Sequence, residues 1–196
     1  MKQYNYDSYS DYVKTQIDAY YEKIHKVWVR KDTVKYIAEM LQHKIPEIKK
    51  GLCHGSRNGH EVKWFRKALN CQDIYGTEIA ESGNKYIIQW DFHDVKPEWL
   101  NSMDFVYSNS LDHAFDPKKC LNAWCSCLSD GGFLVIEHSL QHDKSTKVDP
   151  FAISYSELIK IVPEWTNREF KVSYLLEPEK VHKKRQSKLL FIEKMI

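Results

Sequence analysis

From residue 46 onward, short apolar runs alternate with segments whose apolar residues recur every three or four positions. Continuous apolar runs are typical of strands that a parallel sheet buries on both faces, and the periodic segments are typical of amphipathic helices. The predicted strands cover residues 48–53, 73–77, 86–90, 103–107 and 133–137, and the helices between them cover residues 58–69 and 117–128. This alternation predicts a doubly wound α/β fold with a mostly parallel sheet.

The pattern changes toward the C-terminus. A helix predicted at residues 154–162 is followed by two strands, 170–176 and 189–192, with only a charged connection between them. Consecutive strands that no helix separates pair antiparallel. The predicted sheet therefore has seven strands and ends in an antiparallel hairpin. A turn at Asp130-Gly131-Gly132 is predicted to precede its fifth strand.

The first 45 residues have a helical pattern. Residues 10–43 form the predicted helical region, in which Asp32 or Thr33 caps a second helix and Pro46 follows its end. Six tyrosines lie within the first 21 residues, and they suit either a packed helix or a lid over a ligand. We therefore predict an N-terminal helical cap of residues 1–45 and an α/β unit of residues 46–196, both within one domain.

Composition narrows the class of protein. A hydrophobic content of 42% predicts a folded chain, and a net charge of +2 argues against nucleic acid as a substrate. Five cysteines without a C-x-x-C pair predict reduced thiols, as in the cytoplasm. The polar N-terminus and the lack of an apolar run of about 20 residues predict neither a secretory signal nor a membrane span. We expect a cytoplasmic protein.

The segment from Gly51 to Glu78 contains the clearest ligand signal. Gly55 and Gly59 bracket three residues where a predicted strand gives way to a helix. Glycine lets the backbone turn left-handed and approach a ligand, and the helix N-terminus offers unpaired amides. Glu78 ends the next strand roughly twenty residues later, where nucleoside-binding α/β folds place an acid for the ribose hydroxyls. The segment predicts a nucleoside-containing ligand.

The glycine loop, the acid at the end of the second strand and the order of the strands after them resemble the class I S-adenosylmethionine-dependent methyltransferases. The resemblance covers about residues 46–196. The resemblance implies a glycine loop under the methionine part of the cofactor, an acid for the ribose, an acid and an aromatic ring for the adenine, and an active-site loop after the fourth strand. The terminal hairpin also matches. The cofactor-binding residues that the resemblance implies are His54, Gly55, Ser56, Arg57, Asn58, Gly59, Glu61, Glu78, Ile79, Asp91, Phe92, Ser108 and Asn109.

The glycine loop departs from the family pattern. The family loop usually begins with an acid and has a middle glycine, whereas Cys53-His54 precedes Gly55 here and Arg57 occupies the middle position. The acid that would meet the ammonium of the cofactor is therefore missing from the loop. Glu61, in the first turn of the next helix, either replaces that acid or only interacts favourably with the helix dipole. Cys53 is interpreted as a small core residue.

His113 and Asp112 are the predicted catalytic residues. Methyl transfer requires a positioned acceptor and in some cases a proton acceptor. His113 serves as that base if Asp112 or another carboxylate orients its ring. The alternative is that the pair caps the next helix or lines the cofactor pocket. His138, His142 and Asp143 follow the fifth strand and are interpreted as substrate contacts or a solvated loop, with no metal site predicted.

The resemblance implies S-adenosylmethionine-dependent methyl transfer to a small molecule, at a hydroxyl in preference to an amine. Two alternatives stay open. The first is a non-catalytic protein that binds S-adenosylmethionine or another nucleoside. The second is an NAD-type oxidoreductase, against which the terminal hairpin and the absence of a G-x-G-x-x-G motif argue. The expected partner is a small-molecule substrate, without nucleic acid or membrane, and a homodimer is left open.

Overall fold

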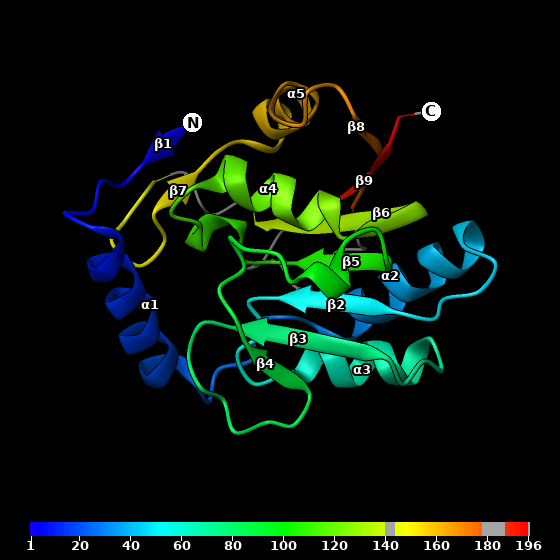
Figure 1. Cartoon of the computed structure of the whole chain (residues 1–196), viewed down its shortest axis with the longest axis horizontal. Helices are drawn as coiled ribbons and strands as arrows, with labels where there is room; N and C mark the ends of the chain where they lie inside the picture. The colour runs from blue at the N-terminus through cyan, green and yellow to red at the C-terminus, as the bar shows by residue number, and fades with distance from the viewer. Residues whose placement is uncertain (140–143, 178–186, 196) are drawn as a thin grey trace.

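The computed structural model describes residues 1–139, 144–177 and 187–195. Within these residues, a seven-stranded sheet has the order β4-β3-β2-β5-β6-β9-β8 (Figure 1). Neighbouring strands are parallel except that β9 runs antiparallel to both β6 and β8. The strands are β2 Gly51–His54, β3 Ile74–Glu78, β4 Ile87–Gln89, β5 Met103–Ser108, β6 Leu128–Ser139, β8 Phe170–Leu176 and β9 Ser187–Lys194. The predicted sheet and its terminal hairpin are confirmed.

Helices cover both faces of this sheet. Those on one face are α2 Lys31–Lys44 and α3 His60–Ala68, and those on the other are α4 Pro117–Ser126 and α5 Tyr155–Trp165. Two short 3-10 helices, η1 Pro97–Trp99 and η2 Leu111–His113, lie in loops. The core on the α2–α3 face includes Val34, Ile37, Leu41, Val62 and Phe65, and the opposite core includes Leu121, Trp124, Leu158 and Val162.

Local sequence explains where the last two helices begin. Asp116 precedes α4, accepts a hydrogen bond from the Lys119 amide at 2.9 Å, and is followed by a proline at the first helical position. Ser154 and Glu157 form a reciprocal capping box at the start of α5. These caps fix the chain directions on the face of the sheet opposite α2 and α3.

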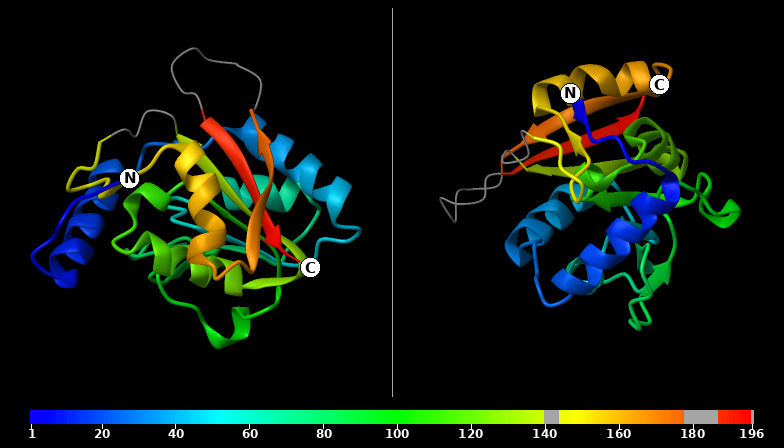
Figure 2. Two further views of the ribbon diagram at one scale, coloured as in Figure 1. Left: turned by 90° about the horizontal axis from the view of Figure 1, so that it is seen from above. Right: turned by 90° about the vertical axis from the view of Figure 1, so that its left-hand side faces the viewer.

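The predicted cap divides into two parts. Helix α1, Tyr9–Lys23, lies at the carboxyl ends of the parallel strands, whereas α2 belongs to a main core layer because its buried residues pack with α3 (Figures 1 and 2). A second, two-stranded sheet was not predicted. In it, β1 Lys2–Gln3 pairs antiparallel with β7 Phe151–Ala152 and carries the N-terminal segment across the same end of the molecule. Of the predicted cap, α1 and β1 therefore lie at the edge where ligands bind in this class of sheet, and α2 does not.

The predicted turn at Asp130-Gly131-Gly132 is wrong as a strand boundary. Strand β6 begins before it, at Leu128, and the pairing of β6 with β5 shifts register between Met103 and Phe105. Gly131 has a φ of +79°, so the glycine supplies a left-handed residue to an irregularity inside the strand rather than to a turn before it.

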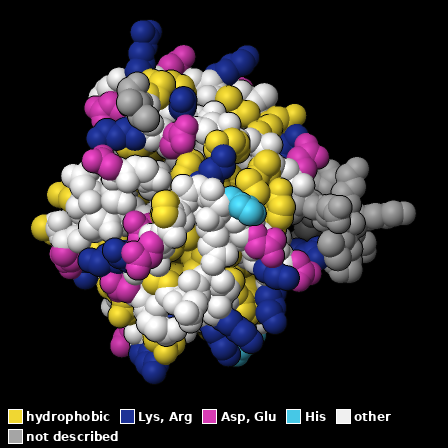
Figure 3. Space-filling model, turned by 90° about the vertical axis from the view of Figure 1, so that its right-hand side faces the viewer, with side chains coloured by type: hydrophobic (Ala, Val, Ile, Leu, Met, Phe, Trp, Pro, Cys, Tyr) yellow, Lys and Arg dark blue, Asp and Glu magenta, His cyan; other side chains and the backbone are white. Residues whose placement is uncertain are grey.

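The remaining predictions concern surface charge, membrane spans and the charged connection before the last strand. Lys, Arg, Asp and Glu side chains are interspersed on the face shown in Figure 3. Within the described parts of the chain, no helix is long and apolar enough to cross a membrane. The charged connection predicted before the last strand, together with His142 and Asp143, falls outside the described residues.

Candidate active site

A cavity of about 530 Å³ opens at the carboxyl ends of β2, β5 and β6. The glycine loop, the loop after β5, the end of β6 and the connection between α1 and α2 form its walls. A smaller cavity of about 50 Å³ adjoins it and shares Gly55, Arg57, Ser110 and His113. Strand order reverses between β2 and β5, and open α/β sheets bind ligands at such a switch point.

The glycine loop keeps its left-handed turns although its middle glycine is missing. Gly55 has a φ of +70°, and a Cβ there would lie 2.5 Å from the Ser110 hydroxyl oxygen, so only glycine fits. Arg57 adopts a φ of +42° in place of the family glycine, at a strain of about 1 kcal/mol. Its guanidinium donates to the Lys26 carbonyl at 3.1 Å, which links the loop to the α1–α2 connection. Gly59, with a φ of +71°, is the N-cap of α3.

Glu78 closes the loop from the neighbouring strand. Its two carboxylate oxygens accept hydrogen bonds from the backbone amides of Arg57 and Ile79, each at 2.9 Å. Burial raises the pKa of Glu78. A carboxylate oxygen that accepts one bond keeps a lone pair for another donor. Glu78 and Ile79 line the smaller cavity, where that lone pair can receive a ligand hydroxyl.

Asp91 ties helix α1 to the loop after β4. One of its oxygens accepts the Tyr9 hydroxyl, and the other accepts the His93 backbone amide at 3.0 Å and the His93 Nδ1 proton at 2.6 Å. The Nε2 of His93 accepts the amides of Phe115 and Asp116, which assigns the proton to Nδ1. Burial favours the neutral acid, but the bonds from His93 and Tyr9 outweigh it and lower the pKa of Asp91.

The smaller cavity is nearly filled by the side of α1 that faces the sheet. Tyr12, Gln16, Ala19 and Tyr20 line it opposite Asp91 and Phe92. A volume of about 50 Å³ holds about one or two water molecules. A nucleoside needs more space, so α1 must shift for one to bind between these walls.

His54 and Ser108 lie behind the glycine loop, and neither lines the two cavities. His54 is 2% exposed, stacks on Trp124, and has its Nδ1 2.8 Å from the Thr77 hydroxyl. Burial lowers the pKa of His54 to about 3, so the ring is neutral. Ser108 donates to the His54 carbonyl at 3.2 Å. Both residues support the loop from the core and do not line either cavity.

Glu61 lies on the wall of the larger cavity. It is only 4% exposed, in the first turn of α3, and it lines the cavity together with Ser56, Arg57 and Asn58. Burial raises the pKa of Glu61 to about 7, against an opposing hydrogen bond from Ser56. A buried carboxylate therefore lies beside the loop from which the family acid is missing.

The imidazole of His113 is held through Nδ1. Its Nδ1 donates to the Val148 carbonyl at 3.0 Å, and an Asp149 oxygen lies 3.5 Å from the same nitrogen. The ring therefore leaves Nε2 as the acceptor. A ring nitrogen of His113 and carboxylate oxygens of Asp112 and Asp149 lie within 4.8 Å of one another, and atoms of these kinds can bind a metal ion. The acceptor that holds Nδ1 is thus the Val148 carbonyl, with Asp149 as a nearby carboxylate, and Asn109 and Asp112 line the same cavity.

Three further residues of this region are not predicted from the sequence. His93 and Asp149 position other site residues, and Glu137 lines the larger cavity from the end of β6. Of these three residues, Glu137 could have been found from the sequence. It is an acid that follows an apolar strand, at the edge of the sheet where the glycine loop also lies. Nothing in the spacing of His93 or Asp149 distinguishes them from ordinary loop residues.

Comparison with known proteins shows the fold. No protein-family model and no curated protein matches the sequence. Among solved structures, 1,6-didemethyltoxoflavin-N1-methyltransferase of Burkholderia thailandensis is similar with a TM-score of 0.76 at 10% identity, over 98% of this chain and 93% of that one. An S-adenosylmethionine-dependent methyltransferase of Clostridium acetobutylicum gives a TM-score of 0.65 at 9% identity, over 92% and 98% of the two chains. The [4+2]-cyclase SpnF gives 0.60 at 10% identity, over 83% and 81%.

These likenesses agree with the strand order and with the single antiparallel insertion of β9 between β6 and β8. The chain has the fold of the class I S-adenosylmethionine-dependent methyltransferases.

Proposed function

We propose that the protein binds S-adenosylmethionine and transfers its methyl group to a small-molecule acceptor. The observation that carries the proposal is the buried carboxylate of Glu61 on a cavity wall that the glycine loop and His113 also form. This arrangement offers an anion for the ammonium of the cofactor although the loop has no acid of its own. The similar Burkholderia structure is described with S-adenosylhomocysteine bound, and this supports the choice of cofactor.

The residues present fit the parts of this cofactor. Glu61 and the loop of residues 55–59 would hold the methionine part, and Glu78 would accept the ribose hydroxyls. Phe92 and Ile79 offer apolar contact to the adenine, while Asp91 accepts its amine in competition with the Tyr9 hydroxyl. When bound, the cofactor supplies an electrophilic methyl group on a sulfonium.

The chain contributes positioning and proton removal. His113 borders both cavities, and its Nε2 takes a proton from the acceptor. A hydroxyl and an amine both lose a proton on methylation, and the sequence favours the hydroxyl. Similar solved structures include an N-methyltransferase of 1,6-didemethyltoxoflavin, a sugar N-methyltransferase and a C-methyltransferase of geranyl diphosphate. The fold alone therefore does not select the acceptor atom.

Calorimetric titration of the purified protein with S-adenosylmethionine, S-adenosylhomocysteine and NAD tests the proposal. We expect binding of the first two at one site per chain and no binding of NAD, because the loop lacks the spacing that suits a pyrophosphate. Binding of NAD alone would favour the oxidoreductase, and binding of none of the three would overturn the proposal. Binding without methyl transfer to any acceptor would leave the non-catalytic alternative.

A further inference from the structure

Glu137 is a buried carboxylate at the end of β6 that no step above uses. It is 5% exposed and lines the larger cavity. One of its oxygens accepts the Tyr107 hydroxyl at 2.6 Å, and the other accepts the Ser187 hydroxyl at 3.0 Å. Because Tyr107 belongs to β5 and Ser187 to β9, the two neighbouring strands hold the carboxylate from both sides.

Within the described parts of the chain, this carboxylate forms no salt bridge. Among the described residues, no lysine, arginine or histidine forms an ion pair with Glu137, and Arg30 acts on it only through its more distant charge. Two neutral hydroxyls satisfy one lone pair on each oxygen but do not neutralise the charge. Burial of an uncompensated carboxylate is unfavourable, and burial raises the pKa of Glu137 accordingly. A cationic ligand would remove that cost.

The walls around Glu137 indicate what kind of molecule would bring the cation. Trp28 and Val29 line the cavity from the α1–α2 connection, and Phe151 and Ile153 line it from β7 and the residues after it. These apolar side chains suit a hydrophobic body, and an aromatic face attracts a cation. Lys23, Lys26 and Arg57 also line this cavity, but among the described residues none of them forms an ion pair with Glu137, and Lys23 and Arg57 border the smaller cavity as well.

We propose that Glu137 binds an ammonium group on the acceptor, so that the substrate class is a small apolar molecule carrying an amine. The inference rests on the proposed function and assigns Glu137 as the residue that selects and orients the acceptor. It leaves the methylated atom free to be a hydroxyl elsewhere on the same molecule, which agrees with the preference stated above.

The test uses three probes of matched size and different charge: phenethylamine, 2-phenylethanol and 3-phenylpropionate. Their binding to the full chain saturated with S-adenosylhomocysteine is measured by calorimetry. We expect phenethylamine to bind at least about tenfold more tightly than the alcohol, and the carboxylate to bind least. Equal affinities for the amine and the alcohol, or no binding of any probe, would overturn the inference.

Two variants separate recognition from structure. Glu137→Gln keeps partners for both hydroxyls but removes the charge, and should abolish the preference for the amine. Tyr107→Phe keeps the charge but removes one hydrogen bond, and should retain the preference. A preference that survives in Glu137→Gln would also overturn the inference. Affinity for S-adenosylhomocysteine, measured in each variant, reports on the proposed function separately, since its loss in the wild type would contradict that function instead.

Discussion

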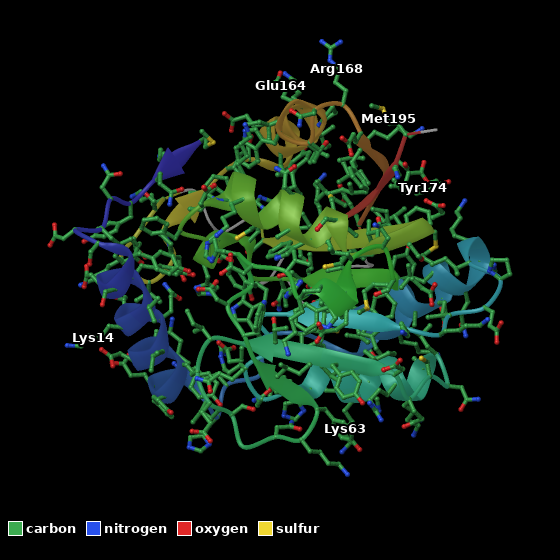
Figure 4. The ribbon with its side chains drawn as sticks, in the orientation of Figure 1. Lys14, Lys63, Glu164, Arg168, Tyr174 and Met195 are labelled. Atoms are coloured by element: carbon green, nitrogen blue, oxygen red, sulfur yellow. The ribbon has the colours of Figure 1, made fainter. Side chains whose placement is uncertain are left out.

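Glu61→Gln is expected to weaken binding of S-adenosylhomocysteine by about 10- to 100-fold, because a hydrogen bond to a charged group contributes about 1.5–3 kcal/mol. The glutamine has the same size and keeps a hydrogen-bond acceptor, so the loss reports the missing charge. Glu164→Gln is the matched control, because Glu164 is exposed on α5 (Figure 4) and lines neither cavity. Calorimetry of the three proteins measures the effect.

The same residue gives the binding a pH dependence. Burial raises the pKa of Glu61 to about 7, and an ammonium ligand requires the ionised form. At about one pH unit below that value, ionising the carboxyl costs about 1.4 kcal/mol, so wild-type affinity should be about tenfold lower near pH 6 than near pH 8. In Glu61→Gln this dependence should disappear. An unchanged affinity and an unchanged pH profile would remove Glu61 from the site.

Unfolding measurements exclude a trivial loss of structure in this variant. A carboxyl whose pKa is higher in the folded state destabilises the fold as pH rises from its unfolded value of about 4.5 through about 7. Glu61→Gln should therefore be at least as stable as the wild type near pH 8, and the difference should shrink near pH 5. A variant that binds weakly yet resists denaturant equally well has lost only the charge.

His113→Ala is expected to reduce methyl transfer by about 100-fold or more while affinity for S-adenosylhomocysteine stays close to that of the wild type. The imidazole lies on the cavity wall with Nδ1 donating to a carbonyl, which makes Nε2 the acceptor, so its removal deletes the proposed proton acceptor and leaves the glycine loop intact. The measurement is the rate at which S-adenosylhomocysteine forms from S-adenosylmethionine and an amine-bearing acceptor.

Asp149→Asn refines the assignment of His113. The substitution removes the charge that lies 3.5 Å from Nδ1 but keeps the backbone bond to Val148. We expect a smaller loss of rate than in His113→Ala, since the ring keeps its tautomer but loses electrostatic support. A nearly normal rate in His113→Ala would leave His113 with a positioning role only.

The sheet was predictable because its strands are continuous apolar runs, and the hairpin because no helix separates the last two strands. The pairing of β1 with β7 was not, since each strand has two residues and they lie far apart along the chain. The position of Gly131 inside β6 was also not predictable, because a glycine with left-handed backbone angles occurs both in turns and in β-bulges.

The site residues were predictable where they belong to one continuous segment, as from Gly55 to Glu78. They were not predictable where residues far apart in the sequence come into contact. Asp91 looked available for adenine, yet Tyr9 reaches it from a position 82 residues earlier in the chain. Glu137 looked like the end of a strand, whereas the structure places it on the cavity wall, where no described residue forms a salt bridge with it. The likeness to a [4+2]-cyclase makes the same point, since such a fold hosts different chemistry and the site residues must decide.

We propose that Glu61 takes the place of the acid missing from the glycine loop in an S-adenosylmethionine site, and a crystal structure of the protein with S-adenosylhomocysteine bound would test this. We expect the amino group of the ligand at about 3 Å from the Glu61 carboxylate, the ribose hydroxyls on Glu78, and α1 shifted away from Asp91. A nucleoside bound outside the glycine loop, or an amino group held by a residue other than Glu61, would contradict it.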